Sequence, residues 1–347
     1  MTSDQSTPRF RMPAEWDPHE STWLSWPHNL DTWPEHLESV ESTMAQAVRL
    51  LLEGEHVDVN VLDSTHAERV RELIGRVDHL PYSVRYHLVP TNDAWCRDHG
   101  AIFVTDHGNA STRLATLWRY NAWGQKYPPY DLDARVAERM ADMLGVPSVK
   151  VDMILEGGSI EVNGEGCLMT TASCLLNENR NPGATRHDIE AALRRYLGAA
   201  EIIWLGGELA GDDTDGHIDN LARFVDRRTI VIASEDDPDD ENYAGLFENV
   251  DRLRRHRFTD GSQPKILKMP MPQPVFSGAD RLPASYCNFY IGNRVVLLPT
   301  YGCAEDYQAA AILQACFPDR RVEGLGCRDV VRGLGAFHCL TQQVPRL

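Results

Sequence analysis

A chain of 347 residues could form one large domain or two, and its 42% hydrophobic and 24% charged content is typical of a globular protein with a sizeable core. The N-terminal segment carries acids and no apolar run, and no later stretch reaches membrane-spanning length, so we expect neither a signal peptide nor a membrane partner. A formal net charge of -17 at pH 7 argues against a nucleic-acid partner and mildly favours cationic ligands. We therefore expect a cytoplasmic protein.

The eight cysteines show no CxxC pair, so neither a disulfide framework nor a zinc site is indicated. Seven are expected to be packing residues: Cys96, Cys167, Cys174, Cys287, Cys303, Cys316 and Cys327. Cys339 differs because it follows His338, is approached through Gly333 and Gly335, and precedes an extended stretch over 340–344. This pattern is typical of a nucleophile at the mouth of a strand. The alternative is a small buried hydrophobic residue, which is the usual role of a free cysteine.

The N-terminal part of the chain predicts a flexible tail over 1–11, with ordered structure beginning at Met12. An aromatic strand is expected over 22–26. Pro34 then opens a helix, because a proline at the first helical position leaves no intrahelical hydrogen bond unmade. That helix should end at Gly54, and the alternating apolar residues of 57–62 predict a strand.

From residue 100 onward, a unit of strand, strand, helix and strand repeats at a spacing of roughly sixty residues. The first copy covers strands at 100–104 and 112–118, a turn at 106–109, a helix at 133–144 and a strand at 149–155. The second covers strands at 159–162 and 167–171, a helix from 185 to 197 and a strand at 201–205. The third covers strands at 217–225 and 229–233, a helix at 243–255 and a strand at 265–268. The fourth covers strands at 288–291 and 294–299, a helix at 305–317 and a strand at 321–323.

The two chain ends complete a fifth copy. The strand around Cys339 lacks a hairpin partner, and the strand around Trp23 begins a helix and strand unit that lacks one. Pairing these two strands would close a ring. We therefore predict an α/β fold, a five-bladed propeller of ββαβ units that forms a single domain over 12–347. A doubly wound sheet is the alternative, and it is disfavoured because hairpins outnumber plain βαβ crossovers.

The start of each predicted hairpin carries polar residues that would face one axis in a ring. These clusters lie at 91–100, at 155–159, at 211–220 and around Cys339. His217 and Asp219 are two apart on a predicted strand, so their side chains should share a face. Taken singly, each cluster also fits a solvated acidic turn or a surface ion pair. Their corresponding positions in a repeat favour a common site.

Several long motifs resemble those of a known family. They are MPAEWDPHESTWLSWP, PTNDAWCRDHGAIFV, YNAWGQKYPPYDLD, LEGGSIEVNGEG, LLNENRNPG, LAGDDTDGHIDN, LPASYCNFYI and HCLTQQVP. Together they make the chain similar, nearly end to end, to the agmatine deiminases, whose family includes the bacterial type of peptidylarginine deiminase among the guanidino-group-modifying enzymes. The resemblance implies a five-bladed α/β propeller and a metal-free hydrolysis of a guanidine to a ureido group and ammonia.

The resemblance also implies roles for individual catalytic residues. Cys339 aligns with the family nucleophile and His217 with the general acid and base. Asp98, Glu156 and Asp219 align with the carboxylates that hold or orient the guanidinium.

The resemblance extends to the substrate pocket. Asp213 falls at a position that contacts substrate, Trp95 and Trp123 fall where aromatic walls line the pocket, and Asp93 is counted with these substrate-binding residues. The chain departs from the family over 331–335, where Val-Arg-Gly-Leu-Gly replaces a more continuous glycine run.

The chemistry of these residue types agrees with that resemblance. A guanidinium is planar, cationic and rich in donors, so Asp98 and Asp219 suit it as paired acceptors. A charged His217 and the bound cation would both favour ionisation of Cys339 for attack on the guanidinium carbon. His217 would protonate the departing nitrogen and then deprotonate water. His338 should point to the opposite face of the strand, so we do not expect it to be the base.

The far end of the substrate separates agmatine, which ends in an ammonium, from arginine, which ends in a carboxylate. Asp213, Trp95 and Trp123 suit an ammonium. Arginine would need a free basic anchor. Three arginines are candidates for it: Arg97, Arg119 and Arg180. We favour agmatine, giving N-carbamoylputrescine for polyamine synthesis, with peptidylarginine or free arginine as the alternative substrate.

Two other classes of protein remain as alternatives. One is a metallohydrolase that uses His217, Asp219 and Cys339, disfavoured because the chain has no HExxH or paired-histidine motif. The other is a ring-shaped binding module without catalysis. We expect no cofactor and no metal, a small guanidino substrate as the partner, and a homo-oligomer, either a dimer or a tetramer, as one assembly to consider.

Overall fold

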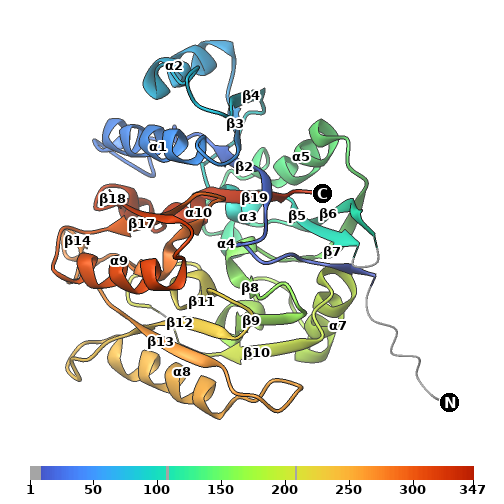
Figure 1. The fold of residues 1–347 in the computed structure, drawn as a ribbon, viewed down its shortest axis with the longest axis vertical. Helices are drawn as coiled ribbons and strands as arrows, with labels where there is room; N and C mark the ends of the chain where they lie inside the picture. The colour runs from blue at the N-terminus through green and yellow to red at the C-terminus, as the bar shows by residue number, and fades with distance from the viewer. Residues whose placement is uncertain (1–8, 107–108, 208) are drawn as a thin grey trace.

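A computed structural model describes residues 9–106, 109–207 and 209–347. In these residues the strands form six sheets, five with three or four strands and one a two-stranded hairpin. Figure 1 shows the longer helices at the periphery and most of the strands between them. The predicted α/β class is confirmed. The six sheets are separate, and no single closed sheet joins them within the described residues, so the propeller stays a prediction.

The five larger sheets share one pattern, in which a first strand runs antiparallel to a second and the second runs parallel to a third. The first unit contains α3 (Cys96–His99), β5 (Ile102–Asp106), β6 (Asn109–Arg119), α4 (Ala122–Gln125), η1 (Asp133–Arg135), α5 (Val136–Leu144) and β7 (Ser148–Ile154). The second contains η2 (Gly157–Ser159), β8 (Ile160–Val162), β9 (Cys167–Thr171), α6 (Ala172–Leu175), α7 (Arg186–Leu197) and β10 (Glu201–Leu205). The third contains η3 (Ile218–Asn220), β11 (Ala222–Phe224), β12 (Thr229–Ser234), α8 (Tyr243–Arg255) and β13 (Lys265–Pro270).

The fourth unit follows a small hairpin of β14 (Phe276–Ser277) and β15 (Asp280–Arg281). It contains η4 (Tyr286–Asn288), β16 (Tyr290–Ile291), β17 (Val295–Thr300), α9 (Glu305–Cys316) and β18 (Arg321–Gly326), and η5 (Val330–Gly333) leads out of it. The four predicted copies of the strand, strand, helix and strand unit are therefore present. Several of their bounds agree with the predicted ones, including those of β9, β10 and α8.

The fifth unit joins the two ends of the chain. It contains α10 (Phe337–Leu340), β19 (Thr341–Pro345), β2 (His19–Ser25), α1 (Leu37–Leu51), β3 (His56–Val61), α2 (Ser64–Ile74) and β4 (Val84–Leu88). β19 pairs antiparallel with β2, with Gln342 opposite Trp23. The predicted pairing of the terminal strands is confirmed. The sequence analysis did not predict α2 and β4, which extend this sheet and lie at the top of Figure 1.

Capping residues explain why the predicted helix ends were accurate. Thr185 caps α7 through a reciprocal bond with Asp188, and the helix ends at Gly198 in the left-handed conformation (φ 70°). α5 likewise ends at Gly145 (φ 62°). A glycine at this position satisfies the last helical carbonyls without the steric penalty of a Cβ.

Two local predictions need correction. Cys339 does not lie in a strand, because α10 is a helical turn and β19 begins only at Thr341. His217 and Asp219 are not on a strand either, since His217 is the extended residue before η3 and β11 begins at Ala222. A helical turn brings successive residues round one axis, whereas a strand alternates them between two faces, so alternation was the wrong rule here.

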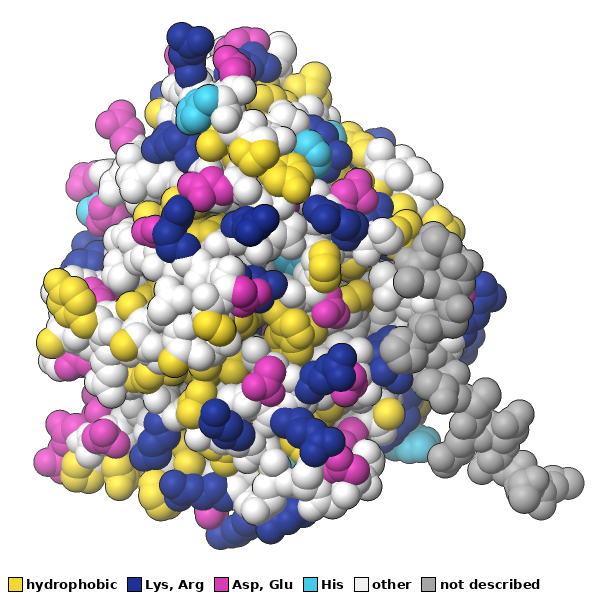
Figure 2. Space-filling view, viewed as in Figure 1, with side chains coloured by type: hydrophobic (Ala, Val, Ile, Leu, Met, Phe, Trp, Pro, Cys, Tyr) yellow, Lys and Arg dark blue, Asp and Glu magenta, His cyan; other side chains and the backbone are white. Residues whose placement is uncertain are grey.

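Phe10 and Arg11, which were predicted to belong to a flexible tail over 1–11, instead form β1 and pair with β5. Residues 1–8 lie outside the described part, as do residues 107–108 of the predicted turn at 106–109. Among the described helices, none combines the length and apolar character needed to cross a bilayer. The face in Figure 2 intersperses basic, acidic and hydrophobic side chains, without a large area of one charge.

Candidate active site

Five short turns, one before the first strand of each unit, meet in a closed cycle. α3 contacts η2, η2 contacts η3, η3 contacts η4, η4 contacts α10, and α10 contacts α3. The polar residues at these turns are Asp98 in α3, Glu156 before η2, His217 and Asp219 at η3, Asn288 in η4 and Cys339 in α10. Segments far apart in the sequence therefore contribute to one buried site.

Gly158 shows how tightly three of these side chains converge. A Cβ on Gly158 would lie 2.6 Å from His217 Nδ1, 2.8 Å from an Asp98 oxygen and 3.1 Å from Asp219 Oδ2. The Gly158 amide also donates to Asp98 Oδ1 at 2.9 Å. Only glycine fits this position without displacing the predicted catalytic groups.

Asp98 is placed to accept a cation. Its Oδ2 accepts a hydrogen bond from Trp123 Nε1 at 3.0 Å and lies 3.8 Å from His217 Nδ1. Burial raises the pKa of Asp98, and the carboxylates of Asp219 and Glu156 add to the rise while His217 opposes it. A guanidinium entering beside Asp98 would therefore relieve an unfavourable concentration of negative charge.

His217 is fully buried and lies between carboxylates. Its Nε2 is 3.9 Å from Glu156 Oε2, and neither ring nitrogen has a hydrogen-bond partner among the described residues. Burial opposes the charged ring, but Asp98, Cys174 and Glu156 outweigh it and raise the pKa of His217 to about 10. The imidazole is therefore protonated at neutral pH, which is the form needed for a general acid.

Glu156 is held by an arginine. Arg180 Nε donates to Glu156 Oε1 at 2.6 Å, and Arg180 Nη1 lies 2.6 Å from Asp215. The Arg180 side chain is fully buried in these contacts. Arg180 therefore orients the carboxylate beside His217 and is not free to anchor a substrate.

Cys339 lies at the inner end of a cavity with its side chain almost fully buried. Asn288 Nδ2 donates to Cys339 Sγ at 3.0 Å, and Sγ lies 3.4 Å from Asp219 Oδ2. Burial, followed by the negative charges of Asp219 and Asp98, raises the pKa of Cys339 well above the ordinary value for a thiol. The thiol is therefore the favoured form in the ligand-free site, because carboxylates outnumber cations around the sulfur.

His338 contradicts the prediction that it points away from the site. Its Nδ1 lies 2.7 Å from Asp219 Oδ2 and its Nε2 lies 2.9 Å from Glu15 Oε2. Glu15 in turn binds Arg97 and Arg223. The helical turn of α10 makes this contact available, and His338 holds the carboxylate that faces Cys339.

Sequence analysis missed Asn288. Its side-chain oxygen accepts from the amides of His338 at 3.0 Å and Cys339 at 3.3 Å, while its amide nitrogen meets the sulfur. The repeat itself could have identified Asn288. It precedes the first strand of the fourth unit, just as Asp98 and Asp219 precede the first strands of their units. It was overlooked because its carboxamide is uncharged.

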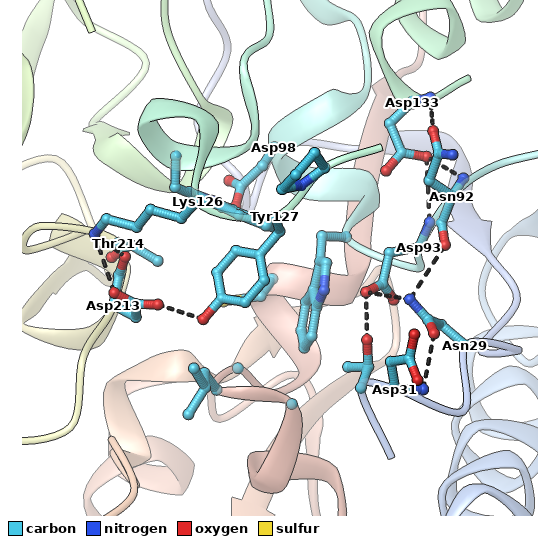
Figure 3. Close-up of a pocket in the computed structure, with 18 of the residues that line it drawn as sticks. Asn29, Asp31, Asn92, Asp93, Asp98, Lys126, Tyr127, Asp133, Asp213 and Thr214 are labelled. Carbon is cyan, nitrogen blue, oxygen red and sulfur yellow. Dashed lines mark hydrogen bonds and ion pairs between the residues drawn. The ribbon is translucent and has the colours of Figure 1, made fainter. Parts of the chain in front are cut away.

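The cavity above these residues has a volume of about 820 Å³ (Figure 3). Asp98, Trp95, Trp123 and Cys339 line it, whereas His217, Glu156 and Asp219 are fully buried and are not among its lining residues. A Cβ on Gly335 would meet the Trp95 ring at 2.6 Å and Cys339 Sγ at 3.2 Å. Gly335 therefore lets the indole and the thiol border the same narrow space.

Two segments that line the cavity have unusual backbone conformations. Ala122, Trp123 and Gln125 all have positive φ values, between 50° and 65°, so α4 is partly left-handed and directs Trp123 towards Asp98. Leu334 interrupts the expected glycine run and takes φ 71°. Conformations of this kind are unfavourable for non-glycine residues and are found most often where function requires them.

The two remaining predicted residues, Asp93 and Asp213, lie on opposite sides of the cavity in Figure 3. Lys126 Nζ is 3.0 Å from Asp213 Oδ1, and the Tyr127 hydroxyl donates to Asp213 Oδ2. Asp93 accepts from neutral groups only, the Thr32 hydroxyl at 2.5 Å and the Ala94 amide at 2.7 Å among them.

Three buried side chains form a set that could hold a metal ion. Donor atoms of Glu156, Cys174 and His217 lie within 4.8 Å of one another in the described chain. Glu156 already binds the Arg180 guanidinium, whose positive charge opposes a second cation there. This set contains neither Cys339 nor Asp219, so it differs from the one considered for a metallohydrolase.

Comparison with known proteins agrees with this geometry. A sequence model of the Porphyromonas-type peptidyl-arginine deiminase family matches residues 11–345. The chain belongs to this family. Among curated members of similar sequence, the agmatine deiminase of Ectopseudomonas mendocina (strain ymp) is 37% identical over 99% of each chain.

Solved structures extend the similarity to the fold of this family member. The agmatine deiminase of Enterococcus faecalis superposes with a TM-score of 0.90 at 31% identity, covering 99% of this chain and 98% of the other. A cysteine-to-serine variant of the C. jejuni agmatine deiminase with substrate bound gives 0.87 at 32%, covering 97% and 96%. An amidinotransferase from Microseira wollei, at 12% identity and a TM-score of 0.58, shares the fold alone.

Proposed function

We propose that this protein is a hydrolase that deiminates agmatine, converting it with water to N-carbamoylputrescine and ammonia. The family and the similarity to agmatine deiminases support the reaction class. The choice of agmatine as the substrate rests on the charge of the cavity. Its acidic lining residues are Asp31, Asp93, Asp98, Asp133 and Asp213, and its lysine and arginine residues are Lys126 and Arg332.

The basic groups near the cavity are already paired. Lys126 contacts Asp213 and Asp215, each at 3.0 Å, and Arg332 lies 3.7 Å from Asp329. None of the three arginines considered as anchors is free either. Arg97 and Arg180 are buried in ion pairs, and Arg119 pairs with Asp152 away from the cavity lining. The distal carboxylate of free arginine would find no unpaired cation among these groups, whereas an ammonium finds acids.

The catalytic roles follow from the contacts. Asp98 and Asp219 accept the guanidinium N–H groups and hold the carbon beside Cys339. The thiol releases its proton to water when the cation binds, and the resulting thiolate attacks that carbon. Protonated His217 gives its proton to the departing nitrogen, and ammonia leaves an amidino group on the sulfur. His217 then takes a proton from water, which attacks the same carbon and releases the ureido product and the thiolate. Glu156 orients His217, and Trp95 and Trp123 form the walls.

The substrate itself activates the nucleophile in this scheme. Asp219 and Asp98 raise the pKa of the resting thiol, and a bound guanidinium offsets both charges. The free enzyme should therefore react slowly with iodoacetamide at neutral pH. The rate should still be rising above pH about 8.5, the ordinary midpoint for cysteine, because only the thiolate reacts.

This alkylation profile has two controls. A Cys339→Ser variant gives the background from the other cysteines. In Asp219→Asn the midpoint should move down, since a charge that raises the pKa is gone. A wild-type midpoint below the ordinary value would show that the thiolate forms without substrate and would contradict the scheme.

Ammonia release from agmatine, free arginine and an arginyl peptide tests the proposed function. We expect the highest kcat/KM for agmatine and no loss after dialysis against a strong chelator. A preference for the peptide would favour a peptidylarginine deiminase, and no release from any substrate would favour a binding module. Activity lost to the chelator and restored by zinc would favour the metallohydrolase.

The proposal includes the architecture around this site. We propose that residues 12–347 form one catalytic domain, a five-bladed α/β propeller, and the cycle of contacts among α3, η2, η3, η4 and α10 supports such a ring. We further propose a cytoplasmic location. A dimer or tetramer remains a proposed assembly.

A further inference from the structure

The distal ammonium of agmatine requires a carboxylate that no other cation already neutralises. An ammonium offers three N–H donors and a full positive charge, so it binds best to an acceptor with a free lone pair in a partly desolvated place. Sequence analysis pointed to Asp213 for this contact. The carboxylates of the cavity differ in whether a cation of the protein already lies beside them. A carboxylate without such a cation is the best candidate to bind the ammonium.

Asp213 already has a cation beside it. Lys126 Nζ contacts Asp213 twice, at 3.0 Å to Oδ1 and at 2.6 Å to the backbone carbonyl. The Tyr127 hydroxyl donates to the other carboxylate oxygen. Figure 3 shows Asp213 joined to Tyr127, on the opposite side of the cavity from Asp93. With its charge offset by Lys126 and its side chain 40% exposed, Asp213 has little attraction left for a second ammonium.

Asp133, Asp31 and Asp98 can also be set aside. Asp133 lies 3.7 Å from His99 Nδ1, and Asp133 is the leading cause that raises the pKa of His99, against burial, to about 10. Asp133 therefore already faces a cation. Asp31 is exposed, where water screens its charge. Asp98 lies beside His217 at the guanidinium end.

Asp93 keeps an unbalanced charge. Its Oδ2 accepts from the Thr32 hydroxyl at 2.5 Å and from the Asn29 amide at 3.4 Å, and its Oδ1 accepts from the Ala94 amide at 2.7 Å. All three donors are neutral. The ion pairs of the described residues do not include this carboxylate, and His28 favours its charged form less than the Thr32 and Ala94 bonds do. About one lone pair of Oδ1 stays available, since a carboxylate offers about four.

The position of Asp93 also suits the task. Burial raises the pKa of Asp93, as expected for a carboxylate without a cation beside it. Asp93, Trp95 and Asp98 all line the cavity and belong to one short segment that leads into α3. This segment therefore presents a carboxylate at one end, an indole in the middle and the guanidinium-binding carboxylate at the other end.

We propose that Asp93, and not Asp213, receives the distal ammonium of the substrate and sets the preference for agmatine. This inference rests on the proposed deiminase function. Thr32 and Asn29 hold the Asp93 carboxylate in place through neutral bonds that leave its charge for the ligand. Asp213, Lys126 and Tyr127 instead tie the segment after α4 to the loop before η3.

The test compares agmatine with butylguanidine, which carries the same guanidine and butyl chain without the ammonium. Asp93→Asn keeps an oxygen that can accept from the Ala94 amide, and its amide nitrogen can donate to the Thr32 hydroxyl, while the negative charge is removed. It should raise KM for agmatine about 10- to 100-fold, the usual effect of losing one charge-assisted hydrogen bond. The kcat for agmatine and kcat/KM for butylguanidine should change little, because the contact is the same in ground and transition states.

Asp213→Asn is the matched control, and it should leave the preference for agmatine over butylguanidine nearly unchanged. An unchanged preference in Asp93→Asn, an equal loss for both substrates in that variant, or a collapse of the preference in Asp213→Asn would each overturn the assignment. A wild-type enzyme that releases no ammonia from agmatine would instead overturn the proposed function. The two failures are therefore distinguishable.

Discussion

Replacing Cys339 with serine is expected to lower the rate of ammonia release from agmatine at least about 1,000-fold, the scale on which loss of a covalent nucleophile acts. A serine hydroxyl ionises far less readily than a thiol, and the neighbours of Cys339 Sγ offer no strong base. The nearest is Asp219 at 3.4 Å, while His217 is held in its protonated form. Serine is similar in size and can still accept from Asn288, so the fold and agmatine binding should survive.

Three measurements check this expectation: initial rates of ammonia release, binding of agmatine by calorimetry, and the thermal melting curve. Cys96→Ser is a matched control, because Cys96 is also fully buried and lies in α3 but does not line the cavity. That variant should stay active. Substantial turnover by Cys339→Ser would show that the sulfur is not the nucleophile.

Replacing Asp98 or Asp219 with asparagine is expected to lower kcat/KM for agmatine by orders of magnitude, with losses of about 2–5 kcal/mol each, as found when one partner of a buried charge pair is removed. Each variant removes one of the two charges that we propose accept the guanidinium. Asp98→Asn does further damage, because its amide nitrogen would face either the Gly158 amide or the Trp123 indole, both of which are donors.

Two further measurements show whether these losses arise in the site. Asp152→Asn is the control for loss of a carboxylate, since Asp152 is 93% exposed and pairs with Arg119 at the surface. Its kcat/KM should be unchanged. In Asp98→Asn the pKa of His217, followed by NMR, should fall below about 10, because Asp98 is the leading cause of the rise. Near-normal kcat/KM in either Asp98→Asn or Asp219→Asn would show that this carboxylate does not bind the guanidinium.

Local signals predicted the repeated units well. The helix of 243–255 and the strands of 167–171 and 201–205 appear with the predicted bounds, and the capped ends of α5 and α7 were expected from glycine and threonine. These features depend on interactions within a few residues. Strands were predicted where the short turns η3 and α10 lie, because a few residues show no measurable periodicity.

The candidate residues were also found from the sequence, since Cys339, His217, Asp98, Glu156 and Asp219 do converge. The protonation states and contacts of these residues were not predicted. The raised pKa of Cys339 depends on Asp219 and Asp98, which precede it by more than a hundred residues, and the contact of His338 with Asp219 depends on a helical turn. The sequence could therefore name the candidate groups but could not assign their protonation.

The amino-acid sequence by itself determined which residue types are present for guanidinium chemistry and how the chain divides into units, because both depend on side-chain identity and short-range spacing. Only the tertiary structure decided which charges are already balanced. Arg180 holds Glu156, Lys126 holds Asp213, and Asp93 has no such partner among the described residues. The Coulomb energy depends on distance and burial, which packing between distant segments sets.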